Sequence, residues 1–403
     1  MNNLSHKMEN SSKTQIHFCK TTGLFLIFFI FFCFLCVCDE KKELNAQTIP
    51  QNYKAPPDTG DGWETTNISN VGLDAKLLLK MLDHIRNNVY PNIHSVLIVK
   101  DNKLVMEEYF DGKDRLNRNI SYNMDTLHEL HSVTKSFTST LIGIAIGQGL
   151  ISGVDAKVVD LLPKYNDFFN DDIKKGILLK HLLSMTSGIK WDEWTHPYSD
   201  PRNSIAQINK SPNPARFVLS QPMETLPGWK YAYSSGVSIL LGEIISGVSN
   251  MSVSQFAEKF LFQPLGIDKY YWSHDPNGIY YTGGGLQLRP RDMAKLGLLF
   301  LNGGRCKSNQ IIPKTWVEEA TKNHISHLST GFEYGYQWWP RTNWVENRYI
   351  DTINAEGRGG QFIIIVPGLE LVAVFTGWND NNLYRQPIKL LVEYILPSAS
   401  EEY

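Results

Sequence analysis

Ser132 and Lys135 have the spacing that lets a hydroxyl and an amine act together. They open the stretch HSVTKSFTSTLIGIAIGQGLI (His131–Ile151), which continues as a long apolar helical pattern. Side chains three residues apart on a helix are neighbours, and a serine on the first turn lies where backbone N–H groups are unpaired. A neutral lysine one turn later can remove the hydroxyl proton. The pattern therefore suggests a nucleophile with its base.

The bare pattern also fits an ordinary helix start. Serine is a common N-cap residue, and the same spacing recurs at Ser187-Gly-Ile-Lys190. Gly188 directly after Ser187 predicts a turn at this second copy. Lys135 must also lose its own proton, since a free lysine has a pKa of about 10.4. The apolar sequence that follows Lys135 is consistent with burial, which would lower this pKa.

A tyrosine is the next candidate for proton transfer. In PGWKYAYSSGVSILLGEII (Pro227–Ile245), Tyr231, Tyr233, Ser234 and Ser235 precede a predicted helix. The Tyr233 phenol can exchange protons with a nucleophile if a nearby lysine lowers its pKa. The alternative is an aromatic side chain that packs at the entrance of the helix.

A glycine-rich segment could supply backbone N–H groups. AEGRGGQF (Ala355–Phe362) leads into a predicted strand. Glycines let a backbone approach another group closely, and an exposed N–H on an inner strand can stabilise an oxyanion. The alternative is a glycine-rich bulge beside a turn.

Other kinds of site are less well supported. His128 and His131 have a spacing that could bind a metal, but no third ligand pattern follows them. The start of a helix explains this pair, and we expect no metal and no cofactor. The chain has no G-x-S-x-G, so the nucleophile elbow of an α/β-hydrolase is not supported.

Two hairpins and several helices should position these groups. Ser95–Lys100 and Lys103–Phe110 flank Asp101-Asn102, and Gln361–Pro367 and Leu369–Gly377 flank a second turn. Helical patterns cover 73–89, 180–185, 238–246, 254–260, 291–304 and 387–396.

Consecutive hairpins favour one antiparallel sheet. We expect an α/β fold of the α+β type, in which terminal helices flank the sheet and a mainly helical lobe lies beside it. The sheet lobe would cover about residues 71–130 and 290–403, and the helical lobe about 131–289. The active cleft should lie between the two lobes.

The composition excludes some classes of partner. The 403 residues carry a formal net charge of −2, and 42% are hydrophobic. No basic cluster with interleaved aromatic residues occurs, so we expect no nucleic-acid partner. Only Cys306 lies outside the N-terminal region, so a disulfide framework in the globular part is excluded.

The N-terminus predicts export. Three lysines precede GLFLIFFIFFCFLCVC (Gly23–Cys38), and DEKKE ends this apolar run. Residues 1–38 therefore suggest a signal peptide, with Cys38 as the acylated residue of a bacterial lipoprotein. An uncleaved membrane anchor is the alternative. The polar residues 39–70 predict a tether, and 71–403 the folded domain. We expect an exported protein that is periplasmic or attached to the membrane.

Together, the three stretches resemble the serine β-lactamase and penicillin-binding protein superfamily, in particular its class C β-lactamase-like esterases and amidases. Ser132-Val-Thr-Lys135 is similar to the S-x-x-K motif, Tyr233-Ser-Ser235 to Y-x-N, and Gly357–Gln361 to the third motif. The resemblance covers about residues 75–395. The connecting segments LLKHLLSMTSGI (Leu178–Ile189) and GGGLQLRPRDMAKLGLLFLNGG (Gly283–Gly304) agree with it in order and spacing.

The resemblance implies the fold of this superfamily and an acyl-enzyme mechanism. Ser132 would attack a carbonyl of a small-molecule or peptide acyl substrate, with Lys135 and Tyr233 as a coupled general base. The oxyanion would lie between the Ser132 N–H and an N–H at Arg358 or Gly359. The hydrolase domain would then occupy residues 71–403.

Two departures from the family pattern concern the substrate. Ser235 stands where β-lactamases place an asparagine that contacts the substrate, and the third motif lacks Lys-Thr-Gly. Both favour an esterase or amidase with an acyclic substrate. The alternatives are a penicillin-binding D-Ala carboxypeptidase or β-lactamase, and a non-catalytic binding protein with the same fold.

Overall fold

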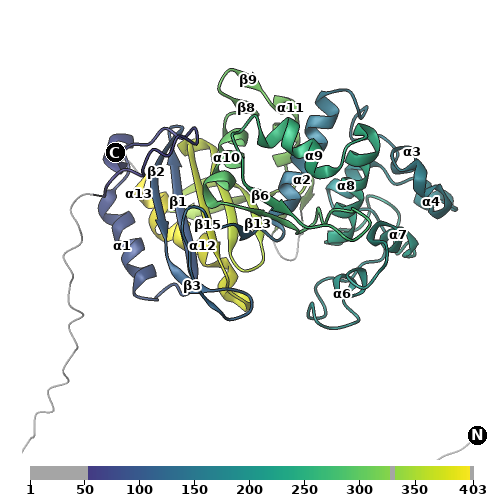
Figure 1. The fold of residues 1–403 in the computed structure, drawn as a ribbon, viewed down its shortest axis with the longest axis horizontal. Coiled ribbons are helices and arrows are strands. Elements are labelled where there is room, and N and C mark those ends of the chain that lie inside the picture. Colours follow the sequence, from purple (N-terminus) through teal and green to yellow (C-terminus); the bar gives the residue numbers. More distant parts are fainter. Residues whose placement is uncertain (1–52, 327–331, 400–403) are drawn as a thin grey trace, which may run out of the picture. The chain divides into compact units, whose positions relative to one another are not determined.

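The apolar runs of the sequence form the centre of a six-stranded antiparallel sheet. The computed structural model describes residues 53–326 and 332–399. The order of the strands is β12-β13-β14-β15-β1-β2, and Figure 1 shows that strands from both ends of the chain meet in the middle. The six strands are β1 (Ile93–Lys100), β2 (Lys103–Tyr109), β12 (Trp339–Val345), β13 (Arg348–Gly357), β14 (Gln361–Val366) and β15 (Leu371–Gly377).

Both predicted hairpins are confirmed, since β1 pairs with β2 and β14 with β15. Asp101 and Asn102 have φ angles of 53° and 64°, as a two-residue turn of type I′ requires. A third hairpin, β12–β13, was not predicted from the sequence; it turns at Glu346 and Asn347. Strand β12 lies at the edge of the sheet and is half exposed, so it lacks an apolar run and tolerates Pro340.

Each face of the sheet is covered by helices, which explains its continuous apolar strands. In β1, the alternate residues Leu97 and Val99 belong to one core cluster, whereas Val96 and Ile98 belong to the other. Helices α2 and α10 contact one face, and the helices of the two termini cover the other (Figure 1). The helices of the termini are α1 (Ala75–Arg86), α12 (Gln386–Leu390), the π-helical turn η6 (Leu391–Ile395) and α13 (Leu396–Ser398).

A mainly helical region lies between the two parts of the sheet sequence, as predicted. Its central pair is α2 (Val133–Gly147) and α8 (Ser235–Ser249), which pack against each other. Every residue of α2 from Val133 to Ala145 is buried, so this helix is surrounded by protein. The other helices are α3 (Val158–Leu161), α4 (Asp172–Lys175), α5 (Leu179–Leu183), α6 (Ser204–Ile208), α7 (Pro214–Ser220), α9 (Val253–Ala257), η3 (Glu258–Phe262), α10 (Pro290–Leu301) and α11 (Lys314–Thr321).

Short strands and 3-10 turns complete the fold. A small three-stranded sheet has the order β5-β7-β6 and joins the segment before α2 to the segment before α10. The short strands are β3 (Asp111–Lys113), β4 (Asn119–Ser121), β5 (His128–Glu129), β6 (Tyr270–Trp272), β7 (Leu286–Leu288), β8 (Arg305–Cys306), β9 (Asn309–Gln310), β10 (Ile325–Ser326) and β11 (Glu333–Tyr334). The 3-10 turns are η1 (Ile68–Val71), η2 (Pro163–Phe168), η4 (Pro367–Leu369) and η5 (Asn381–Arg385).

The segment before α1 corrects one prediction. The polar composition of residues 39–70 predicts a tether, but residues 53–70 pack against the sheet. Trp63 and Ile68 are 6% and 1% exposed, and Thr65 forms a β-bridge with Leu104 of β2. A few apolar anchors within a polar segment are enough to fix it. Residues 39–52 and the predicted signal peptide 1–38, including Cys38, lie outside the described residues.

Among the helices that the structure describes, none alone has the length and hydropathy to cross a membrane. Helix α8 and the segment Val253–Phe262 meet that test only as a pair, and the pair is bent by 74°.

Candidate active site

Ser132 stands at the N-cap position of α2 but does not act as a cap. Its side chain makes no capping hydrogen bond, and the Lys135 Nζ lies 3.0 Å from the Ser132 Oγ. The preceding residue, His131, has a φ of 48°, in a region that residues other than glycine rarely adopt. The helix-start interpretation therefore does not account for this hydroxyl.

Lys135 is buried and directed at three oxygen atoms. Its side chain is 1% exposed, and its Nζ lies 3.0 Å from the Ser132 Oγ, 2.8 Å from the Ser235 Oγ and 2.6 Å from the Gly283 carbonyl oxygen. Burial lowers the pKa of Lys135 to about 8, and the charge of Glu193 opposes this effect. A substantial fraction of the amine is therefore neutral in mildly alkaline solution.

The second S-x-x-K copy has a different environment. Ser187 follows α5 in a turn, where Gly188 has a φ of 77°. The Ser187 Oγ accepts a hydrogen bond of 3.3 Å from the Ile189 N–H. This hydroxyl is part of the turn, as the sequence predicts.

Tyr233 lies against both Ser132 and Lys135. The Lys135 Nζ lies 4.8 Å from the centre of the Tyr233 ring, and the interaction of Tyr233 with Ser132 opposes the effect of burial on its pKa. The Trp194 ring stacks on the Tyr233 ring, with ring centres 4.9 Å apart. Proton exchange by Tyr233 was predicted on the condition that a nearby lysine lowers its pKa. In the structure, burial instead raises the pKa of Tyr233 well above 10. The phenol therefore keeps its proton at neutral pH.

Ser235 meets the lysine from the first turn of α8. The preceding residue, Ser234, caps this helix by accepting a hydrogen bond of 3.2 Å from the Val237 N–H. The Ser235 Oγ lies 2.8 Å from the Lys135 Nζ and 2.7 Å from a carboxylate oxygen of Glu193. The Ser235 hydroxyl is thus engaged by protein groups on two sides.

The glycine-rich loop passes directly against the start of α2. A side chain at Gly357 would place its Cβ 2.4 Å from the Leu130 carbonyl oxygen and 3.3 Å from the Val133 nitrogen. Within residues 53–326 and 332–399, the N–H groups of Ser132 and Arg358 donate to no acceptor. Two free N–H groups on adjoining segments can bind the oxygen of a tetrahedral intermediate.

The Gly359 carbonyl and the Arg358 side chain of this loop bind other protein groups. Gly359 has a φ of 86°, and its carbonyl oxygen accepts a hydrogen bond of 2.9 Å from the Asn379 N–H. The Arg358 guanidinium forms an ion pair of 2.9 Å with Asp380 and lies over the rings of Tyr198 and Trp378. Its side chain is 45% exposed, so this cation stands at the mouth of the site.

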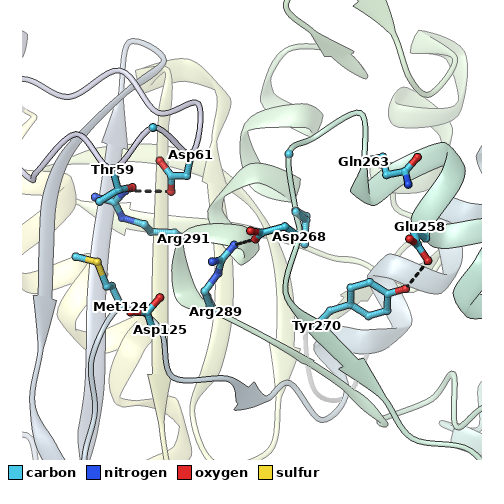
Figure 2. Close-up of a pocket in the computed structure, with 13 residues that line it drawn as sticks. Thr59, Asp61, Met124, Asp125, Glu258, Gln263, Asp268, Tyr270, Arg289 and Arg291 are labelled. Atoms are coloured by element: carbon cyan, nitrogen blue, oxygen red, sulfur yellow. Dashed lines mark hydrogen bonds and ion pairs between the residues drawn. The ribbon is translucent and has the colours of Figure 1, made fainter.

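Ser132 lines a cavity of about 350 Å³. Its lining combines polar groups of the site with apolar side chains of the helical region, namely Ser132, Glu193, Tyr198, Ile205, Ile208, Ser235, Ile239, Tyr281 and Arg358. A larger cavity of about 670 Å³, shown in Figure 2, surrounds Arg289 and Arg291. Ser132 lines the smaller of these two cavities and not the larger one.

Comparison with known families agrees with this geometry. The sequence model of the Beta-lactamase family matches residues 94–384. The chain belongs to the Beta-lactamase family. This match contains Ser132, Lys135, Tyr233 and the 357–360 loop, and it includes both parts of the sheet.

Curated relatives match part of this Beta-lactamase-family chain. A Salmonella typhimurium protein, provisionally named a D-alanyl-D-alanine carboxypeptidase, is 26% identical over 215 residues, which are 50% of this chain and 49% of that protein. This Beta-lactamase-family chain thus spans about half the length of the curated relatives it matches.

Two solved structures share the fold. A family VIII carboxylesterase is 18% identical, with a TM-score of 0.63 over 81% of this chain and 98% of that one. A penicillin-binding protein homologue from Caulobacter crescentus is 15% identical, with a TM-score of 0.63 over 81% and 97%. These likenesses establish the fold, and the substrate is a separate question.

Glu193 is the functional candidate that the sequence analysis missed. This carboxylate is 4% exposed and accepts hydrogen bonds from the backbone and side chain of Ser235. The available signal was a pair of acidic residues, Asp192 and Glu193, between Trp191 and Trp194. A carboxylate among aromatic residues is costly to bury without partners.

The predicted histidine pair is accounted for by packing. His128 stacks on Tyr122, with ring centres 4.6 Å apart, and His131 lies against Trp378. Among the described residues, no group of three or more His, Cys, Asp or Glu side chains could hold a metal ion.

Proposed function

We propose that this Beta-lactamase-family chain is a serine hydrolase that cleaves an ester or amide bond through an acyl-enzyme. The observation that carries the proposal is a buried lysine amine 3.0 Å from a serine hydroxyl that does not cap its helix. Ser132 is the nucleophile and Lys135 is the base. The non-catalytic alternative gives no reason to bury an amine in this arrangement.

Acylation begins when the Ser132 Oγ attacks the carbonyl carbon of the substrate. The hydroxyl proton passes to the Lys135 Nζ, and the carbonyl electron pair moves onto the oxygen. The free N–H groups of Ser132 and Arg358 bind this oxyanion.

The intermediate then collapses and the bond to the leaving group breaks. The leaving group takes a proton from the Tyr233 hydroxyl as the Lys135 ammonium returns one to Tyr233. A concerted transfer of this kind never accumulates a tyrosinate, in keeping with the raised pKa of Tyr233.

Deacylation repeats the sequence with water as the nucleophile. Lys135 takes one water proton while the resulting hydroxide bonds to the acyl carbon. The Ser132 Oγ then leaves and recovers its proton from Lys135, so the enzyme returns to its starting state.

The lining of the cavity supports a short acyclic acyl group of low polarity. Ile205, Ile208 and Ile239 form its apolar wall. Arg358 is the cation of the third motif, and Asp380 already neutralises it. A cleft without a free cation at that position is poorly suited to the carboxylate of a penicillin or a cell-wall peptide.

A substrate panel tests this proposal. Wild type is expected to hydrolyse short p-nitrophenyl esters, and Ser132→Ala to lose that activity. Ser187→Ala is the matched control, since it alters the second S-x-x-K copy and should keep full activity. Activity of Ser132→Ala equal to wild type would overturn the proposal.

The second candidate function is a D-Ala carboxypeptidase, which the name of the Salmonella relative favours. Release of D-alanine from a D-Ala-D-Ala peptide, together with stable capture of a fluorescent penicillin, would select it over the esterase.

We also propose that the domain works outside the cytoplasm, carried there by residues 1–38. The lysine-flanked apolar run that ends at Cys38 supports this idea. Radiolabelled palmitate should enter the wild type and not Cys38→Ala, and equal labelling of both would contradict the lipoprotein form.

A further inference from the structure

Glu193 is a buried carboxylate that holds Ser235 from two directions. It lies between α5 and α6 and is 4% exposed. One carboxylate oxygen accepts 2.7 Å from the Ser235 N–H, and the other accepts 2.7 Å from the Ser235 hydroxyl. Trp191 Nε1 donates at 2.9 Å and the Tyr198 hydroxyl at 3.4 Å. Hydrogen-bond donors therefore surround both oxygens.

This arrangement fixes the direction of the Ser235 hydroxyl. An ionised carboxylate only accepts, so the single hydrogen of the Ser235 hydroxyl points at Glu193. What Ser235 presents to the Lys135 Nζ, at 2.8 Å, is then a lone pair. Lys135 must be the donor in that contact.

The Gly283 carbonyl imposes the same condition from another side. It lies 2.6 Å from the Lys135 Nζ and can only accept. A neutral amine has two N–H groups and one lone pair. Ser235 and Gly283 use both N–H groups, which leaves the lone pair for the third neighbour, the Ser132 hydroxyl at 3.0 Å.

We propose that Glu193 is a positioning residue that acts through Ser235 to aim the lone pair of neutral Lys135 at the Ser132 hydroxyl. This inference rests on the proposed function, in which that lone pair receives the Ser132 proton. It also gives Ser235 a role inside the proton-transfer machinery.

A glutamine at position 193 would undo the orientation without changing the size of the side chain. Its amide nitrogen can donate to the Ser235 oxygen, and the Ser235 hydrogen is then free to bond the lone pair of Lys135. The base would be occupied by Ser235, and Ser132 would lose its proton acceptor.

The charge of Glu193 has a second, separable effect. It favours the ammonium form and so raises the pKa of Lys135 against the effect of burial. The other titratable groups around the amine are Tyr233 and His131, while Tyr198 and Arg358 lie beyond Glu193. Removing the Glu193 charge should lower the pKa of Lys135 and move the acid limb of reactivity to lower pH.

The test measures the rate of labelling by a fluorophosphonate probe between pH 6 and 10 on the full chain. Glu193→Gln is expected to label about 10- to 100-fold more slowly at its plateau, as misplaced groups typically cost. Its acid limb should lie at lower pH than that of wild type. A wild-type plateau, or a slow plateau with an unmoved limb, would overturn the positioning role.

Glu243→Gln is the matched control. Glu243 is a buried glutamate on α8, the helix of Ser235, and pairs with Lys164 at 2.6 Å. Its loss removes the same charge without a contact to Lys135, so plateau and limb should stay those of wild type.

Two more variants keep the outcomes distinguishable. If Glu193→Gln does not fold, Ser235→Ala tests the same arrangement, because it removes the hydroxyl that links Glu193 to Lys135. This variant should also label slowly. A wild-type rate in Ser235→Ala would overturn the inference. Labelling of Ser132→Ala at the wild-type rate would overturn the proposed function itself, whatever Glu193 does.

Discussion

At the scale of single residues, burial decides which group of the site holds the proton. The same desolvation lowers the pKa of Lys135 to about 8 and raises that of Tyr233 well above 10. Each shift favours the neutral form. In the proposed mechanism, the neutral fraction of Lys135 is the base and the protonated Tyr233 phenol is the acid.

This assignment predicts the pH profile. Protonation of Lys135 removes the base, so kcat/KM for an ester should fall as the pH drops below about 8. Tyr233→Phe should lower the plateau and leave this limb in place, since the phenol stays protonated throughout the range. The measurement is kcat/KM from pH 6 to 10, and a limb that moves in Tyr233→Phe would contradict the assignment.

The sequence predicts part of this site because part of it is local. Ser132 and Lys135 are three residues apart, and Tyr233 precedes a recognisable helix, so motif spacing draws attention to them. Gly283 and Glu193 complete the site through contacts that link residues 148 and 42 positions apart. A backbone carbonyl has no side-chain signature, and an isolated glutamate is usually at the surface.

At the scale of elements, one glycine sets how closely α10 approaches the sheet. A Cβ at Gly297 would lie 2.5 Å from the Val372 Cγ1 and 2.9 Å from the Ile363 Cγ2. These side chains come from β15 and β14, on the face that α10 covers. The helix can rest on the strands only because position 297 lacks a side chain.

Gly297→Ala should therefore lower the free energy of unfolding. Overpacking costs about 1–3 kcal/mol, more than the gain of about 1 kcal/mol in helix propensity. Gly247→Ala is the control. Gly247 is exposed on α8, and its nearest neighbour would lie 3.7 Å away, so alanine should stabilise there. Urea denaturation measures both, and equal shifts would contradict the packing argument.

The elements most accessible to prediction carry their own signals. The hairpin β1–β2 combines buried strands with Asp101-Asn102, whose turn conformation those residue types favour. Strand β12 has neither a buried face nor an apolar run, since the edge of the sheet leaves it half exposed. Its place is set by pairing with β13, which the sequence of β12 does not reveal.

At the scale of the whole molecule, Arg291 joins three distant parts of the chain. Its guanidinium donates from α10 to Glu107 of β2 at 2.7 Å and to Asp61 at 3.0 Å in the segment before α1. Figure 2 shows Arg291 beside Thr59 and Asp61. Arg291 and Glu107 are 3% and 2% exposed as side chains, so each is the main compensation for burying the other.

Breaking this pair on one side should be worse than removing it altogether. Arg291→Met leaves the Glu107 charge buried without its partner, at an expected loss of about 3–5 kcal/mol in urea denaturation. The double variant Arg291→Met/Glu107→Met should recover much of that loss. Arg202→Met is the control, since its pair with Asp200 is at the surface. A double variant no more stable than the single one would contradict the argument.

The central claim is that Ser132 is the nucleophile of this Beta-lactamase-family chain. The most direct measurement reacts the whole protein with a fluorophosphonate and locates the adduct by mass spectrometry of its peptides. The account predicts one adduct per chain, on Ser132, with full labelling of Ser187→Ala and none of Ser132→Ala. An adduct on another residue, or a labelled Ser132→Ala, would contradict it.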